Sequence, residues 1–443
     1  MAHHTPRSYL DLQRRLDLAP QGAPASDALF AILAHLFSER EASLVAVLPI
    51  TFFSLAKAAA LWKLPEAEAR VLLDGLADKG IIVDFSKGDT RTYALAPPMA
   101  GFFEFSLMRT DGRFDTALLS ELFHRYINEE DAFVRAIFGI DPPIERTFVQ
   151  EDQIRPEDQS CVLDYERASH AVTSASFVTV GRCYCRHKME HLGRACDAPQ
   201  DVCLTFNDTA RSLAAHGIAR EITSAEGLAV LARAMQHGLV QIGSNQQESV
   251  TWICNCCRCC CEALLAYRRL GYNPRIHTNF VAVRTAATCS ACGRCVRRCP
   301  ADALLIDAVG RVVAIDDERC LGCGVCVRFC SSGALALGRR PTTKFVPKDT
   351  FERTVLMAID TGTLQNVLFD HFDLWTYDLL RRFLGIVLRL PPVQRALATR
   401  QLRSRYMTMF GKLYRRHDAT VFEGRAPDYS HPELGPPRRD GSG

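Results

Sequence analysis

The chain has 443 residues, 48% of them hydrophobic, which is enough for roughly two to four domains with sizeable cores. Its net charge of +3 is too small to indicate a nucleic-acid or membrane partner by itself. The 19 cysteines are gathered in clusters, which excludes a disulfide scaffold and indicates metal binding in a reducing compartment.

No secretory signal pattern is seen, so we expect a cytoplasmic protein. The apolar stretch 42–62 contains Lys57 and is interrupted by Pro49, which favours pieces of a buried core over a membrane-spanning helix. Neither a glycine-rich dinucleotide fingerprint after a strand nor a phosphate-binding loop is present, and no hydrolytic constellation is recognisable. The sequence therefore gives no support for NAD, flavin or ATP chemistry.

Residues 27–110 predict three helices followed by a β-hairpin. The helices are expected over 27–40, 51–62 and 65–79, and the hairpin strands over 81–85 and 90–96. This order resembles the winged-helix fold. The third helix carries four acidic residues against two basic ones, which argues against DNA binding because phosphate contacts need positive charge. We therefore interpret this domain as a docking or dimerisation module.

Residues 111–160 are predicted as a connector, helical over 116–138 and extended over the proline-containing stretch 140–159. Residues 161–275 form a cysteine-rich α/β unit. Its expected helices cover 164–174, 207–216 and 224–237, and its expected strands cover 176–181, 239–242 and 249–253. Cys161 has no other cysteine near it in the sequence, so we expect it to be a small buried hydrophobic residue and not a metal ligand.

Ten cysteines of this unit are candidate metal ligands. A first group of four follows the strand 176–181, and a second group places six thiols within eight residues; the ten are Cys183, Cys185, Cys196, Cys203, Cys254, Cys256, Cys257, Cys259, Cys260 and Cys261. Adjacent side chains cannot all enter one core, so packing does not explain such density. Two further four-iron clusters with two spare thiols, one cluster with a redox dithiol, and a zinc site all remain open.

Basic side chains adjoin the first of these thiols. Arg186, His187 and Lys188 follow Cys185 directly, and positive charge beside thiolates lowers their pKa and raises the potential of a cluster. His187 and His191 are alternative ligands, because imidazole can replace thiolate at iron.

Residues 276–340 contain the strongest motif of the chain. The run Cys289-x2-Cys292-x2-Cys295-x3-Cys299-Pro is followed by a second run of the same spacing at Cys320, Cys323, Cys326 and Cys330. Three thiolates on a tight loop can reach three irons of one cubane, while the fourth, at a helix start, points to the neighbouring cluster. Zinc sites typically use one or two C-x2-4-C pairs per metal, which fits this pattern less well.

The two runs resemble bacterial two-cluster ferredoxins. The resemblance implies two [4Fe–4S] clusters with crossed ligands: Cys289, Cys292, Cys295 and Cys330 for one, and Cys320, Cys323, Cys326 and Cys299 for the other. Ser331 replaces the second proline of the family pattern. The segment from Arg284 to Arg340 contains nine arginines and five acidic residues. This excess of positive charge predicts an acidic redox partner.

Residues 341–420 are predicted as a helical C-terminal region, with helices over 348–372, 374–389 and 393–416, and residues 421–443 as a disordered tail. The last helix is basic and amphipathic. It would suit an anionic membrane surface or an acidic protein groove, although a solvated helix face explains the same pattern.

The fold class expected for the whole chain is α+β and multidomain. The cysteine segments together resemble a group of bacterial and archaeal dicluster-ferredoxin-like proteins, in which a winged-helix front precedes C-x-C-R and C-N-C-C-x-C-C-C segments. The resemblance implies relay of single electrons to a partner oxidoreductase through the two ferredoxin-type clusters and one or two more. Two alternatives stay open: a redox-sensing winged-helix transcription regulator, and an oxidoreductase subunit with a catalytic centre at Cys254–Cys261.

Overall fold

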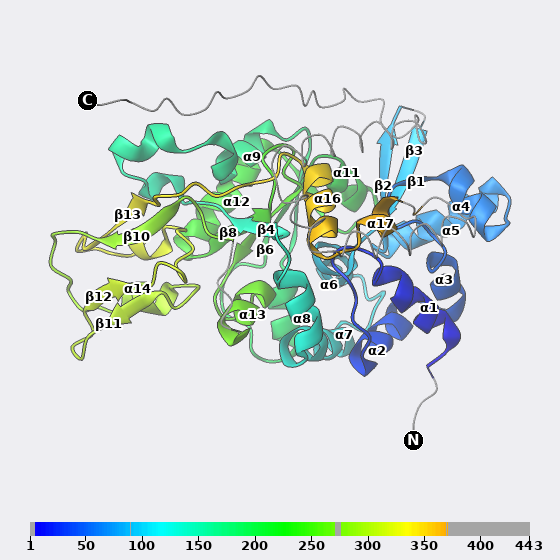
Figure 1. Cartoon of the computed structure of the whole chain (residues 1–443), viewed down its shortest axis with the longest axis horizontal. Coiled ribbons are helices and arrows are strands. Elements are labelled where there is room, and N and C mark those ends of the chain that lie inside the picture. Colours follow the sequence, from blue (N-terminus) through cyan, green and yellow to red (C-terminus); the bar gives the residue numbers. More distant parts are fainter. Residues whose placement is uncertain (1–4, 89, 271–275, 369, 371–443) are drawn as a thin grey trace, which may run out of the picture. The chain divides into compact units, whose positions relative to one another are not determined.

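The computed structural model describes residues 5–88, 90–270, 276–368 and 370, all within one compact unit, Met1–Arg381 (Figure 1). The helices predicted over 374–389 and 393–416 and the tail 421–443 lie outside the described residues. In the described part of the chain, no helix is both long enough and apolar enough to cross a membrane.

The N-terminal part is helical with one small sheet. Its elements are α1 (Arg7–Leu16), α2 (Asp27–Leu36), α3 (Glu39–Val45), β1 (Phe53–Ser54), α4 (Leu55–Trp62), α5 (Glu66–Asp78), β2 (Ile82–Lys87) and β3 (Thr90–Leu95), and the strands pair antiparallel in the order β1-β3-β2. The helix predicted over 27–40 is two helices, because Ser38 and Glu41 form a reciprocal capping box that begins α3. The other predicted helices and the hairpin are present; the winged-helix class itself stays a prediction.

Three short helices follow, α6 (Phe103–Met108), α7 (Thr116–Phe123) and α8 (Asp131–Phe138). Aromatic side chains hold them together: the ring centroids of Phe103 and Phe123 are 4.6 Å apart, and those of Tyr126 and Phe133 are 4.8 Å apart. The helical material predicted over 116–138 is thus α7 and α8, joined by a π-helical turn over His124–Glu129.

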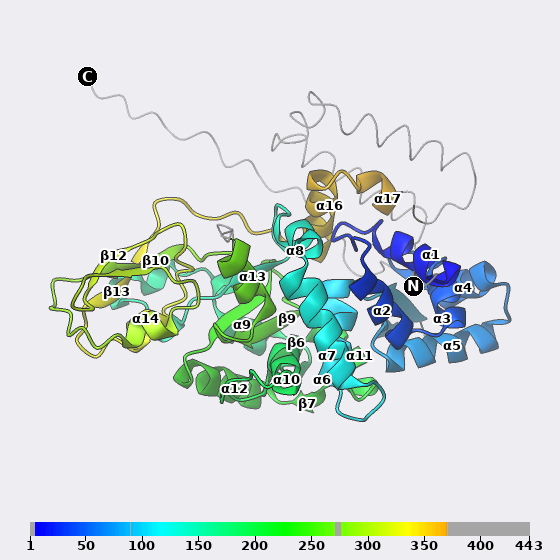
Figure 2. The ribbon, with the colours of Figure 1, turned by 90° about the horizontal axis from the view of Figure 1, so that it is seen from below.

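The cysteine-rich unit is built on a six-stranded antiparallel sheet in the order β4-β8-β9-β6-β5-β7. Figure 2 labels β6, β7 and β9 of this sheet among the helices of the unit. The strands are β4 (Glu145–Thr147), β5 (Val178–Arg182), β6 (Asp201–Phe206), β7 (Arg220–Ile222), β8 (Val240–Ser244) and β9 (Trp252–Cys256). The helices are α9 (Ala168–Ser174), α10 (Tyr184–His191), α11 (Asn207–Ala215), α12 (Ser224–Gln236) and α13 (Glu262–Leu270). The stretch 140–159, predicted as an extended linker, supplies the edge strand β4, because its backbone pairs with β8.

The remaining described elements form the ferredoxin-like module and a short helical segment. β10 (Phe280–Arg284) pairs with β13 (Leu335–Arg339), β11 (Leu304–Ile306) pairs with β12 (Val312–Ile315), and α14 (Arg294–Arg298) and α15 (Val325–Arg328) follow the cysteine loops. α16 (Thr350–Asp360) and α17 (Leu364–Leu368) come last. Asp349 caps α16 by accepting a hydrogen bond from the backbone N–H of Glu352.

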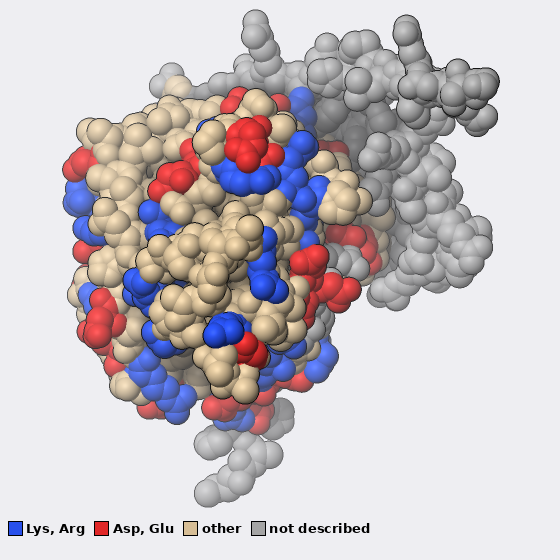
Figure 3. All heavy atoms as spheres, turned by 90° about the vertical axis from the view of Figure 1, so that its left-hand side faces the viewer, with Lys and Arg blue, Asp and Glu red and all other residues tan. Residues whose placement is uncertain are grey.

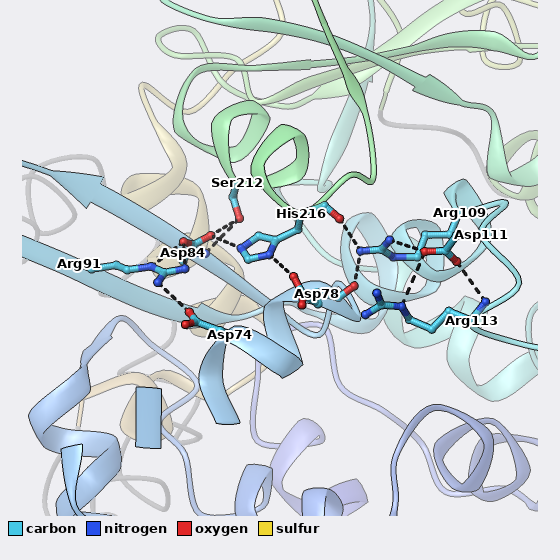
Figure 4. A network of polar contacts seen from close by, with 9 residues as sticks. All are labelled: Asp74, Asp78, Asp84, Arg91, Arg109, Asp111, Arg113, Ser212 and His216. Atoms are coloured by element: carbon cyan, nitrogen blue, oxygen red, sulfur yellow. Dashed lines mark hydrogen bonds and ion pairs between the residues drawn. The ribbon is translucent and has the colours of Figure 1, made fainter. Parts of the chain in front are cut away.

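A polar network joins the N-terminal part to the cysteine-rich unit (Figure 4). His216, which follows α11, lies with Nδ1 2.6 Å from a carboxylate oxygen of Asp78 and Nε2 3.1 Å from one of Asp84. Ser212 donates to Asp84 at 2.6 Å, and Arg91 forms an ion pair with Asp84 at 2.5 Å. Burial alone would raise the pKa of Asp84. The hydrogen bond with His216, followed by those with Ser212 and Arg91, nevertheless holds this pKa well below its usual range. The network therefore attaches β2 and the end of α5 to α11.

Candidate functional site

Six of the ten upstream thiols gather where strands of the central sheet end. This six-thiol set comes from the start of α10, from β6, from β9 and from the start of α13; it is Cys183, Cys185, Cys203, Cys254, Cys256 and Cys261. On β9 the alternation of a strand points Cys254 and Cys256 the same way and Asn255 the other way. The Asn255 amide donates to the carbonyl of Val202 at 2.7 Å, which fixes this register.

The thiols of this set are coupled in their titration. Each thiol affects the pKa of the next in the order Cys183, Cys185, Cys261, Cys256, Cys254, Cys203. The neighbouring thiol of Cys185 contributes most to lowering the pKa of Cys261, to about 7, and that of Cys203 contributes most to lowering the pKa of Cys254. Neighbouring thiols and burial raise the pKa values of Cys183, Cys185, Cys203 and Cys256 well above their usual range. Thiolate, the form that binds metal, is therefore favoured at Cys254 and Cys261.

The other four upstream thiols form a separate, tighter group. This four-thiol set, Cys196, Cys257, Cys259 and Cys260, has all its sulfur atoms within 4.8 Å of one another. The Sγ of Cys260 lies 3.7 Å from that of Cys259 and 3.9 Å from that of Cys196. Proximity in sequence would group Cys196 with Cys183, Cys185 and Cys203. In the structure its thiol instead lies among those of the turn that follows β9.

Arg186 lies between the two sets. Its side chain is fully buried and donates through Nη1 to the carbonyl of Asn255 at 3.1 Å, while its Nε and Nη2 have no hydrogen-bond partner in the described part of the chain. Burial alone would lower its pKa, but electrostatic interaction with the sulfurs of Cys183 and Cys257 raises it. A buried guanidinium with thiolates on both sides supplies counter-charge for anionic metal centres, as the sequence suggested for this position.

The neighbouring basic residues have other partners. Lys188 is fully buried and forms an ion pair with Glu262, which is 2% exposed. His187 Nδ1 lies 2.7 Å from the carbonyl oxygen of Leu107, and its Nε2 lies 3.2 Å from Nε2 of His191. Burial lowers the pKa of His187. Neither histidine belongs to the four-thiol set.

A cavity of about 360 Å³ opens beside the six-thiol set. All six thiols line it, together with apolar side chains from the N-terminal part such as Phe85, Phe105 and Met108, and residues of α16 such as Met357. This volume lies in the range of small-molecule sites. The cavity therefore gives this set of thiols room for a cluster, a small molecule, or both.

Four charged residues in the cavity wall were not predicted from the sequence: Glu104, Glu145, Glu262 and Arg353. The Glu104 carboxylate accepts hydrogen bonds from two successive backbone N–H groups, those of Ala100 and Gly101, both at 2.9 Å. Burial raises the pKa of Glu104 and of Glu145 to about 8. A single carboxylate within the aromatic run Gly101–Phe105 could have indicated from the sequence that Glu104 is a buried polar residue. No sequence pattern marks Glu145 or Arg353.

In the ferredoxin-like module two small cavities lie among the cysteines. One, of about 30 Å³, is lined by Cys289, Cys292, Cys295 and Cys330, which we name the outer quartet. The other, of about 20 Å³, is lined by the inner quartet, Cys299, Cys320, Cys323 and Cys326. These are the two crossed groups that the repeated motif implies. All thiols of the inner quartet are buried, whereas Cys292 of the outer quartet is exposed.

The module's backbone suits a cluster as well. Gly293, Gly322 and Gly324 all have positive φ, which lets the loops fold tightly around a cavity. Backbone N–H groups donate to thiols of the inner quartet: Ala282 to Cys320 at 3.4 Å and Ala303 to Cys299 at 3.3 Å. Thiols that converge on a cavity and accept backbone hydrogen bonds are the donor set of an iron–sulfur cluster, so these residues fit [4Fe–4S] groups.

The comparisons agree with this part of the geometry. Residues 282–331 match a family model described as a 4Fe-4S dicluster domain. No curated protein and no solved structure matched the chain. The chain thus contains an iron–sulfur dicluster domain of the kind that serves electron transfer, and metal binding rests on this match and on the cysteine clusters.

The inner quartet is connected to the upstream thiols through buried apolar side chains. Cys323 belongs to the same buried apolar cluster as Cys256 and Cys261 of the six-thiol set. The backbone N–H of Gln150, just after β4, donates to the carbonyl of Cys323 at 2.9 Å. The module is therefore packed against the sheet on the side of its buried quartet.

Proposed function

We propose that this chain transfers single electrons through its ferredoxin-like module to a further iron–sulfur centre held by the six-thiol set. The observation that supports the proposal is the apolar cluster shared by Cys323 with Cys256 and Cys261, because it connects the inner quartet to the upstream thiols through buried side chains. When bound, each [4Fe–4S] cluster supplies a one-electron couple. The outer and inner quartets are the proposed ligands of the two module clusters.

The outer quartet is the proposed entry point. Cys292 is exposed, and Arg294 and Arg297 follow it on α14; Arg297 donates to the carbonyl of Cys292 at 3.2 Å. Figure 3 looks onto one end of the described chain and shows basic and acidic side chains spread between uncharged ones. An acidic redox protein is the partner that the arginines beside Cys292 would attract, and raising the ionic strength should slow electron delivery from it.

The cavity supports a second role, that of an oxidoreductase subunit acting on a small molecule at the six-thiol set. Its walls are largely apolar, with the carboxyl groups of Glu104 and Glu145 and the guanidinium of Arg353 among the thiols. Such a wall would bind and orient a compact substrate that has both apolar and polar groups.

The proposal is tested by iron, acid-labile sulfide and low-temperature electron paramagnetic resonance on anaerobically purified full-length protein. About eight irons belong to the module, and irons beyond these are assigned upstream. Cys256→Ser should remove the additional irons and their signal but leave the module's signals, while Cys161→Ser, outside every thiol set, should change neither. Wild-type protein that holds only about eight irons, with no upstream signal, would reject the relay and leave the module as a separate ferredoxin.

A further inference from the structure

The four-thiol set has the dimensions of a single-ion site. A zinc ion with four thiolates at about 2.3 Å holds its sulfurs about 3.8 Å apart along the edges of a tetrahedron. The separations in this set are 3.7 Å between Cys259 and Cys260 and 3.9 Å between Cys196 and Cys260, with all pairs within 4.8 Å. We infer that Cys196, Cys257, Cys259 and Cys260 bind one tetrahedral zinc ion and no iron–sulfur cluster.

The other thiols of the same chain provide a comparison. In a cubane each thiolate binds a different iron at an outer corner, so the four sulfurs must lie farther apart than on one shared ion. Among the described residues, the four-thiol set is the only group of ligand atoms that meets the 4.8 Å limit. The inner and outer quartets do not meet it, as expected for cluster ligands. The four-thiol set is therefore shaped differently from the residues assigned to iron.

The surroundings fit a closed structural site. The cysteines supply four thiolates, which complete a tetrahedral shell and leave no position for substrate. Four thiolates on a divalent ion carry a net charge of −2, and the buried guanidinium of Arg186 interacts electrostatically with Cys257, so a compensating cation lies nearby. Cys257 and Cys260 are buried against Met189, Ala234 and Leu239, whereas Cys196 is half-buried and Cys259 is exposed, so the site is anchored in the core on one side and reaches the surface on the other.

The site would join two loops that lie far apart in the sequence. Cys196 follows α10, and the other three thiols belong to the turn between β9 and α13. Arg258 lies within this turn and pairs with Asp302 of the ferredoxin-like module at 2.6 Å. A zinc ion would therefore hold the turn in the conformation that reaches the module. This role is separate from the proposed electron transfer, which uses none of these four thiols.

The test uses full-length protein produced with both iron and zinc in the medium. We expect one zinc per chain that survives dialysis against a chelator, and zinc-edge X-ray absorption with four sulfur neighbours at about 2.3 Å and no nearby iron. Cys260→Ser should reduce bound zinc from one to near zero and leave the iron content unchanged. The matched control Cys203→Ser, in the six-thiol set, should keep its zinc.

Three results would overturn the inference: wild-type protein without zinc, a single iron bound by four thiolates in its place, or loss of about four irons from the Cys260→Ser variant. If Cys260→Ser is insoluble, the absorption spectrum of the wild-type protein decides alone, because sulfur-only neighbours around zinc and an iron neighbour at short range give different scattering.

Discussion

The guanidinium of Arg258 lies 2.6 Å from a carboxylate oxygen of Asp302. The two residues belong to different parts of the chain: Arg258 is flanked by Cys257 and Cys259, and Asp302 follows Cys299 by three positions. Arg258 also donates to the carbonyl oxygens of Val296 at 3.3 Å and Cys299 at 3.4 Å. One side chain therefore connects the four-thiol set to the loop that carries a ligand of the inner quartet.

Arg258→Ala should loosen this connection. The ion pair is partly exposed, 31% for Arg258 and 38% for Asp302, so most of the loss comes from the carbonyl hydrogen bonds. We expect the loss of these contacts to lower the free energy of unfolding by about 2 kcal/mol in total. This loss should be seen as a lower midpoint of anaerobic thermal unfolding. Arg311→Ala, an exposed arginine of the same module, serves as the control and should change stability by less than about 0.5 kcal/mol. Equal effects of the two variants would show that the contact has no stabilising role.

Gly322→Ala should damage the inner quartet. Gly322 has φ +67°, and an added Cβ would lie 2.0 Å from the carbonyl oxygen of Phe280 and 2.3 Å from Oγ1 of Thr278. Gly333 is the matched control, since its φ is +65° and a Cβ there would meet nothing within 4 Å. Gly333→Ala should cost only the backbone strain, about 1–2 kcal/mol. Gly322→Ala should in addition lower the iron content by about four per chain, and iron contents equal in the two variants would contradict this account.

Local patterns predicted the elements around the site well. The expected strand 176–181 is β5, Val178–Arg182, and the expected helix 224–237 is α12, Ser224–Gln236. Both depend on alternation, caps and stops within a few residues. The cap of α12 is Thr223, which forms a capping box with Glu226.

Grouping the ten upstream cysteines required long-range information. Cys203 and Cys254 come together because β6 pairs with β9, and the sequence between them gives no sign of that pairing. Cys196 leaves its neighbours in the sequence because the loop after α10 crosses to the turn after β9. The cavity was missed for the same reason: Glu104, Glu145 and Arg353 come from three separate regions of the chain, and only the packing of those regions places them in one wall.

Lys188→Met should be strongly destabilising. The pair of Lys188 and Glu262 is almost fully buried, with exposures of 0% and 2%, and the ammonium also donates to the side-chain oxygen of Asn128 at 2.6 Å. Removing the cation leaves a buried carboxylate without its counter-charge, which costs about 3–5 kcal/mol. The double variant Lys188→Met/Glu262→Gln should recover part of this loss. Additive effects in the double-mutant cycle, measured by denaturant unfolding, would show that the two side chains do not interact.

The contact between His216, Asp84 and Asp78 should make stability depend on pH. The hydrogen bond with Asp84 is the main cause that raises the pKa of His216, and the bond with Asp78 adds to it against the effect of burial. A raised pKa means that the folded state binds the proton more tightly, so the imidazolium contributes its full stabilisation below about pH 6.5. That contribution is lost as the pH rises through the raised pKa. Asp84, whose pKa is lowered, stabilises the fold above about pH 3.9 and loses this effect as the pH falls through the lowered pKa.

His216→Gln keeps a polar side chain of similar size but removes the titration. We expect the variant to be less stable than the wild type at pH 5.5 and the difference to shrink at pH 9, because at high pH the wild-type imidazole is neutral too. Denaturant unfolding of both proteins across this range measures the difference directly. His237→Gln, at the end of α12 and outside the network of Figure 4, is the control and should give a difference that is small and independent of pH. A stability difference for His216→Gln that stays constant or grows with pH would mean that His216 is neutral in the folded protein, and that the N-terminal part is held to α11 by Arg91, Ser212 and apolar packing alone.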